Sequence, residues 1–125
     1  MIDHIGIRAR DYKKSKAFYT AALAPLGYGV IMELTEEMNL GYIGVGFGID
    51  RKPDFWVGAG EPNGTVHIAL VAKDRQTVDA FHAAALAAGG KDHGGPGVRA
   101  HYHPNYYGAF VLDPDGNNIE AVCHK

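Results

Sequence analysis

The sequence predicts an α+β fold made of two βαβββ repeats, which form paired four-stranded mixed sheets around a concave cleft with the helices on the outer faces. Three observations favour this fold: an internal repeat, a strand followed by a helix at the start of each copy, and three strand-like stretches after each helix. We expect one domain, in which the first repeat covers about residues 1–62 and the second about residues 63–125.

The internal repeat is visible in two runs that begin with histidine. Residues 4–11 read HIGIRARD and residues 67–74 read HIALVAKD, at an offset of 63 residues. The match continues beyond these runs, so that nine of the twenty residues over positions 4–23 are identical to those over positions 67–86. This many identities at one offset indicate a duplicated structural unit.

Each copy opens with a strand and continues into a helix. Apolar residues alternate in the opening runs with a period of two, which is typical of a strand with one buried face. Asp11 and Asp74 end these runs, at the position where a side chain caps the first backbone N–H groups of a helix. Helices are therefore expected over about residues 12–24 and 75–88, and glycine or proline residues follow both segments.

Three strand-like stretches follow each helix. The segment 113–117 is rich in residues that turns require, and it predicts a hairpin between the last two strands of the chain. The six stretches are expected at about residues 28–35, 41–48, 54–59, 97–103, 106–112 and 118–123. Both halves thus follow one plan.

Composition and charge exclude several classes of protein. The 125 residues are 46% hydrophobic and 21% charged, which is typical of a globular domain. The formal net charge is -2 and basic residues do not cluster, so we expect no binding to nucleic acid or to an anionic membrane. Cys123 is the single cysteine, which excludes an intrachain disulfide. Without a secretion signal or a long apolar run, the expected location is the cytoplasm.

Three side chains have the chemistry of a metal site. His4 and His67 hold equivalent positions at the start of the two opening strands and, by alternation, point away from the helices. Ile119 and Ala121 make the helix-facing side of the last strand, so Glu120 points to the same side as the histidines. Two imidazoles and a carboxylate on one concave surface can bind a divalent metal ion and leave coordination positions open. Zinc, nickel, manganese, cobalt and iron are not distinguished.

The alternative is that these three are ordinary polar residues. A histidine at the end of a strand is usually exposed, and a glutamate after Asn117 and Asn118 usually faces solvent. The repeat favours the metal site, because two of the three residues are equivalent by symmetry and the third shares their expected face.

Six other residues are candidates for roles around this site. Histidine titrates near neutral pH and tyrosine can donate to a developing oxyanion, so a stretch rich in both is expected to move a proton at the substrate. The candidates for proton transfer are His101, His103 and Tyr107. Phe47 and Trp56 are candidates for an apolar wall, and Arg8 for neutralising a substrate carboxylate or phosphate. For each, the alternative is a purely structural or solvent-exposed position.

The motifs resemble those of the vicinal oxygen chelate superfamily, the glyoxalase / bleomycin resistance protein / extradiol dioxygenase family. The resemblance covers essentially the whole chain and is carried by residues 3–7 (DHIGI), 66–70 (VHIAL) and 113–120 (DPDGNNIE). In metal-dependent members the ligands come from the first, fifth and eighth strands, which His4, His67 and Glu120 match. A fourth ligand often comes from the fourth strand, where this sequence has Phe55 or Trp56 at the mirrored position. This departure argues against a four-ligand glyoxalase I site.

The resemblance implies a homodimer that acts on a small oxygenated organic molecule. The implied activity is that of a metal-dependent lyase, isomerase or related enzyme that chelates two adjacent oxygens, and iron would also permit a dioxygenase. The alternative is a metal-free protein that binds and sequesters a small molecule, as bleomycin-resistance proteins do; a third option is a module with an idle pocket. Whether the cleft lies within one chain or is shared across a dimer stays open.

Overall fold

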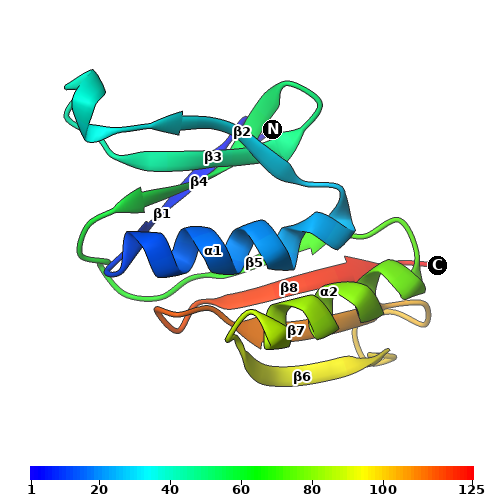
Figure 1. The fold of residues 1–125 in the computed structure, drawn as a ribbon. Coiled ribbons are helices and arrows are strands. Elements are labelled where there is room, and N and C mark those ends of the chain that lie inside the picture. Colours follow the sequence, from blue (N-terminus) through cyan, green and yellow to red (C-terminus); the bar gives the residue numbers. More distant parts are fainter.

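The structure is a computed structural model that describes residues 1–125. Its elements follow the order βαβββ twice, with two short 3₁₀ helices (η) in the first half (Figure 1). In chain order they are β1 Ile5–Ala9, α1 Tyr12–Leu23, η1 Ala24–Leu26, β2 Gly29–Leu34, η2 Glu36–Met38, β3 Gly44–Ile49, β4 Lys52–Ala59, β5 His67–Val71, α2 Arg75–Ala87, β6 Lys91–Val98, β7 Tyr107–Leu112 and β8 Asn118–Cys123.

The strands form two separate four-stranded sheets with the same topology. Their orders are β1-β4-β3-β2 and β5-β8-β7-β6. In each sheet the first strand of the repeat runs parallel to the last, and the other pairs are antiparallel. These mixed sheets confirm the predicted α+β class. They also leave β1 and β5 as edge strands that do not pair with each other.

Both helices begin at the aspartates that the sequence indicates. The Asp11 carboxylate accepts a hydrogen bond from the backbone N–H of Lys14 at 3.1 Å, and Asp74 accepts one from Thr77 at 2.8 Å. Each bond satisfies a backbone donor that the first turn of a helix leaves free. Neither helix has the length and apolar character needed to cross a membrane.

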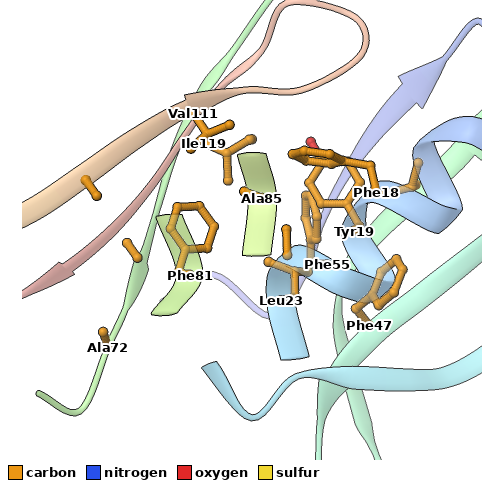
Figure 2. Packing of buried hydrophobic residues seen from close by; sticks show 14 of the residues in the cluster. Phe18, Tyr19, Leu23, Phe47, Phe55, Ala72, Phe81, Ala85, Val111 and Ile119 are labelled. Carbon is orange, nitrogen blue, oxygen red and sulfur yellow. The ribbon is translucent and has the colours of Figure 1, made fainter. Parts of the chain in front are cut away.

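One hydrophobic core joins the two halves. Helix α1 packs against α2, so the helix-covered faces of the two sheets meet in the middle of the chain (Figure 1). Figure 2 shows Phe18 and Tyr19 of α1 on one side of this core and Phe81 and Ala85 of α2 on the other. The ring of Tyr19 meets that of Phe55 edge to face, with centroids 5.0 Å apart.

The shared core determines where the other faces of the sheets lie. The helices were predicted on the outer faces of the paired sheets, but both lie in the interior between the halves, where their apolar faces bury each other, so that part of the prediction is wrong. The uncovered face of each sheet, here termed its open face, therefore points away from the other half. Apolar side chains remain exposed on both open faces, including Met32 at 48% and Val71 at 79% of full exposure. Single chains with such exposed apolar surface usually bind another molecule there.

One predicted strand was misplaced. A strand was expected over residues 97–103, but β6 covers Lys91–Val98, and residues 99–106 form a loop that leads into β7. The reason is the glycine-rich sequence of β6, which carries no alternating apolar pattern. The strand pairs with β7 only through two irregularities of register, one between Asp92 and Gly94 and one between Gly94 and Gly97.

Candidate metal centre

His67 and Glu120 form a contact pair on the open face of the second sheet. His67 opens β5, and Glu120 lies in the neighbouring strand β8, where it stands opposite Ala69. Its Oε1 atom is 2.8 Å from Nε2 of His67. Glu120 is only 1% exposed, whereas the His67 side chain is 53% exposed. The pair therefore combines one buried carboxylate and one imidazole that solvent can reach.

Tyr106 holds the other carboxylate oxygen. Its hydroxyl group donates a hydrogen bond to Oε2 of Glu120. Burial, followed by this hydrogen bond to a carboxylate, raises the pKa of Tyr106 to about 12. A side chain at Gly108 would come within 3.2 Å of Oε2, so the glycine leaves the space that the carboxylate occupies. The two oxygens of Glu120 thus have separate partners.

Tyr106 was missed in the sequence, and its neighbour Tyr107 was chosen in its place. Tyr107 pairs with Cys123 and lies on the helix-covered side, where its hydroxyl donates to Asp79 of α2 at 2.6 Å. The placement of Tyr107 beside the cleft is therefore corrected. The signal was present: Cys123 follows Ile119 and Ala121 with the period of two, so it shares their helix-facing side, and its antiparallel partner must share that side.

The other two candidates for proton transfer lie in the loop between β6 and β7. The ring of His101 is 4.1 Å from that of Tyr102, measured between centroids. His103 accepts a hydrogen bond at Nδ1 from the backbone N–H of Asn105 at 3.1 Å. Neither histidine has a hydrogen bond to His67 or Glu120, and both are exposed.

His4 does not join His67 and Glu120 within the chain. Its Nδ1 atom lies 2.7 Å from the carboxylate of Asp3, and its ring borders a shallow hollow of about 350 Å³ on the open face of the first sheet. No group of three histidine, cysteine, aspartate or glutamate side chains in the structure is arranged to hold a metal ion. The structure thus brings two of the three predicted ligands together and leaves the third on the other sheet.

The candidates for ligand contact in the first half separate into two groups. Trp56 is half-buried on the open face beside Tyr42, with ring centroids 6.3 Å apart. Arg8 is exposed and takes part in no ion pair. Phe47, in contrast, is fully buried in the core, with its ring centroid 6.4 Å from that of Phe55. Its proposed place in an apolar wall is wrong, because the pleat of β3 turns it toward α1 (Figure 2).

The register of the sheets identifies the residue that mirrors Glu120. Gly6 pairs with Trp56 in the first sheet, and its counterpart Ala69 pairs with Glu120 in the second. Of the two alternatives that the sequence left open, the mirrored position therefore holds Trp56, while Phe55 belongs to the core. An indole ring has no lone pair for a metal, so the first sheet supplies no fourth ligand.

The pair of His67 and Glu120 fits part of a divalent-metal site. An imidazole nitrogen and a carboxylate oxygen suit zinc, manganese, nickel, cobalt or iron. A carboxylate with so little exposure is costly to bury without a compensating positive charge. Here its partners are a tyrosine hydroxyl and an imidazole, neither of which carries a permanent positive charge. Two ligands alone do not make a catalytic site, which commonly has three.

The largest groove of the chain, of about 970 Å³, lies elsewhere. It separates the beginning of β1 from β5 and is floored by η1 and the residues that follow it. Its lining is largely apolar, with Asp54 and Lys73 among its few charged residues. The groove touches His67 but not Glu120. The buried carboxylate of Glu120 and its partners lie instead on the open face of the second sheet.

The fold and the paired histidine and glutamate define a protein of the glyoxalase class. The sequence profile of the Glyoxalase/Bleomycin resistance protein/Dioxygenase superfamily matches residues 1–121, and the chain belongs to this superfamily. The curated proteins include no sequence with a significant match.

Solved structures agree with this assignment. The chain is 30% identical to a glyoxalase/bleomycin resistance protein from Albidiferax ferrireducens, with 96% of each chain covered and a TM-score of 0.71. A glyoxalase/bleomycin resistance protein/dioxygenase family enzyme from Burkholderia phytofirmans has the same fold at 21% identity, 99% and 98% coverage and a TM-score of 0.69.

Glyoxalase I from Zea mays also shares the fold, at 20% identity and a TM-score of 0.70. The match covers 99% of this chain but 44% of the maize chain, so this protein spans less than half the length of that enzyme.

Proposed function

We propose that the protein is a metal-dependent enzyme of the lyase or isomerase type that acts on a small oxygenated organic molecule. The observation that carries this proposal is the contact between His67 and the buried carboxylate of Glu120 on an open sheet face. A divalent metal ion held there would supply Lewis-acid polarisation of two adjacent substrate oxygens.

The third ligand is proposed to come from a second copy of the chain. His4 lies on the open face of the first sheet, and that face points away from His67 of the same chain. Strands β1 and β5 each have one edge that pairs with no other strand of the chain, and apolar residues are exposed on both open faces. In a two-fold dimer, the first half of one subunit can therefore cover the second half of the other. The partner subunit's His4 would then complete each site.

The chain's own residues have distinct proposed roles at this site. Glu120 and His67 bind the metal, and Tyr106 holds Oε2 of Glu120 so that Oε1 stays directed at His67. Trp56 and Arg8 of the partner's half would line the opposite wall. In neutral His103, acceptance of a hydrogen bond at Nδ1 leaves the ring proton at Nε2. His103 can thus donate a hydrogen bond from Nε2 to a substrate oxygen that gains negative charge, and His101 is the second candidate.

Metal binding by tag-free protein tests the proposal. The protein is stripped with a chelator, dialysed, and titrated with zinc, manganese and nickel while bound metal is measured by mass spectrometry and affinity by calorimetry. We expect one ion per subunit and a loss of affinity of at least ~100-fold in His67→Ala and Glu120→Gln, exceeding the ~10–100-fold that losing a supporting residue costs. His82→Ala is the control, because His82 binds Asp92 on the far side of α2.

The results separate the enzyme from its main alternative. Wild-type protein that binds none of these metals, or that binds them equally well after His67→Ala, would overturn the metal site. A metal-free sequestration protein would instead bind an apolar or aromatic compound through the exposed face around Trp56 and Tyr42. Quenching of Trp56 fluorescence by such compounds, unaffected by metal, would identify that function.

A further inference from the structure

Arg99 has a fixed position on the open face of the second sheet. Its two terminal nitrogens donate to backbone carbonyls of β6, to Gly97 at 2.9 Å and to Gly95 at 2.8 Å. Its guanidinium carbon lies 5.4 Å from the centroid of the Phe110 ring. The side chain is half-buried, so its charged group is oriented by three contacts and does not extend freely into solvent.

The glycines of β6 provide the space for this guanidinium. A Cβ atom at Gly97 would lie 3.1 Å from one terminal nitrogen of Arg99, and one at Gly94 would lie 3.2 Å from the other. Both distances are tighter than ordinary van der Waals contact, so larger residues would displace the group. The register of β6 is irregular around these glycines, in the same stretch that supplies the two carbonyl groups bound by Arg99. The strand is thus shaped to hold a cation.

The positive charge of Arg99 has no carboxylate partner. None of the ion pairs in the structure includes it, and Asp92, in the preceding strand β6, is bound to His82 at 3.0 Å. A guanidinium has five N–H donors, and backbone carbonyls occupy two of them. The remaining donors and the full charge are available to a ligand.

Arg99 borders the pair of His67 and Glu120. Phe110 stands opposite Glu120 in the ladder between β7 and β8. The ring of His67 is 6.2 Å from that of Phe110, and Arg99 contacts the same ring. The backbone N–H of Arg99 also donates to the carbonyl of Tyr106 at 2.7 Å. A small molecule over Phe110 would therefore reach the metal ligands and the guanidinium together.

We propose that Arg99 is a substrate-binding residue that recognises an anionic group, and hence that the substrate is a small organic anion. Carboxylates and phosphate-type groups both present two oxygen atoms at a spacing that a guanidinium can bind through two hydrogen bonds. This deepens the proposed function, on which it rests for placing the reacting part of the substrate beside His67 and Glu120.

Anion binding by the metal-free protein tests Arg99 directly. Chelator-treated, dialysed protein is titrated with inorganic phosphate and with benzoate at constant ionic strength, and the Nε–H signals of arginine side chains are followed by NMR. We expect the Arg99 signal to shift and saturate, with at least one of the two anions. Arg99→Gln should weaken that binding at least tenfold, and Arg99→Lys should weaken it less, because lysine keeps the charge but not the two-pronged geometry.

Two controls make the result specific. Arg51→Gln removes the same charge from the exposed turn between β3 and β4 and should leave the affinity unchanged. Benzyl alcohol, a neutral counterpart of benzoate, should bind at least tenfold more weakly. Binding that survives Arg99→Gln, equal binding of the neutral compound, or no saturable shift in wild-type protein would overturn the proposal. If Arg99→Gln fails to fold, the proposal is tested by the affinity of the Arg99→Lys variant and by the shift of the Arg99 signal in wild-type protein.

The outcome is independent of the metal test. The titration contains no metal, so the anion site can fail while His67 and Glu120 still bind an ion. Conversely, a folded Arg99→Gln variant should bind zinc as wild-type protein does, which separates a substrate-binding role from support of the metal ligands.

Discussion

The hydroxyl group of Tyr106 donates a hydrogen bond to Oε2 of Glu120, the most deeply buried carboxylate on the open face of the second sheet. The next residue, Tyr107, donates to Asp79 on the opposite side of the same sheet. Two adjacent tyrosines therefore serve different parts of the molecule, one at the candidate metal centre and one at the surface of α2.

This difference gives a matched pair of variants. Tyr106→Phe removes the donor that orients Glu120, and we expect zinc affinity to fall by ~10–100-fold, as it does when other supporting partners of metal ligands are lost. Tyr107→Phe should leave the affinity unchanged. Calorimetric titration of both variants measures the effect, and equal affinities in the two would contradict the role of Tyr106.

The shared site predicts complementation between inactive subunits. His4→Ala and Glu120→Gln should each lose metal binding as homodimers. In a mixed dimer, one site combines the intact His4 of one subunit with the intact His67 and Glu120 of the other. Co-expression with two different tags, followed by isolation of the mixed dimer, should therefore restore one metal ion per dimer. Mixed dimers without metal would contradict a site shared between subunits.

A buried hydrogen bond between the two halves should contribute measurably to stability. The hydroxyl of Tyr19, in α1, donates to Oδ2 of Asp113 at 2.5 Å, and both residues are buried. A net hydrogen bond to a charged group contributes about 1.5–3 kcal/mol, so Tyr19→Phe should lower the free energy of unfolding by that amount. Urea denaturation measures the loss. No change in the midpoint would show that the bond contributes nothing net.

The cap of α2 predicts part of the acid sensitivity of the fold. The hydroxyl and the backbone N–H of Thr77 bind the Asp74 carboxylate and hold its pKa below the ordinary value of 3.8. A carboxyl group whose pKa is lowered by folding stabilises the fold above pH 3.8, and that contribution is lost as pH falls through the lower, folded value.

Asp74→Asn separates this charge effect from capping, because the amide oxygen can still accept from the backbone N–H of Thr77. Between pH 6 and pH 3, the variant should therefore lose less free energy of unfolding than wild-type protein. Urea denaturation at the two pH values measures the difference, and identical losses would argue against a role for the Asp74 charge.

Much of the fold could be predicted because its signals are local. The offset between His4 and His67, the capping aspartates and the alternation around Glu120 each depend on residues near one another in the chain. The position of β6 could not be predicted in this way, since glycine has no side chain and therefore shows no alternation of apolar and polar residues. Phe47 failed for the same reason: its neighbours in β3, Gly46 and Gly48, give no alternation against which to assign its side.

The candidate site could be predicted only in part. Parity placed His67 and Glu120 on one face, and the structure confirms that they meet. The relative placement of the two sheets could not be predicted, because the same apolar faces can be buried by packing helix against helix or edge strand against edge strand. The position of His4 relative to Glu120 depends on which of these two packings the halves adopt, and the periodicity of apolar residues does not distinguish them.

The interior shared by α1 and α2 has a consequence for how the chain can vary. Phe18 and Phe81 are related by the duplication, yet each fills space that the other repeat helps to enclose. A chain divided in the 60–66 connection would leave two fragments that each lack the apolar contacts made by the other, and we expect neither to fold alone. The duplicated halves are thus expected to unfold together in one cooperative transition. A substitution that changes side-chain volume in the core of one half must be compensated in the other.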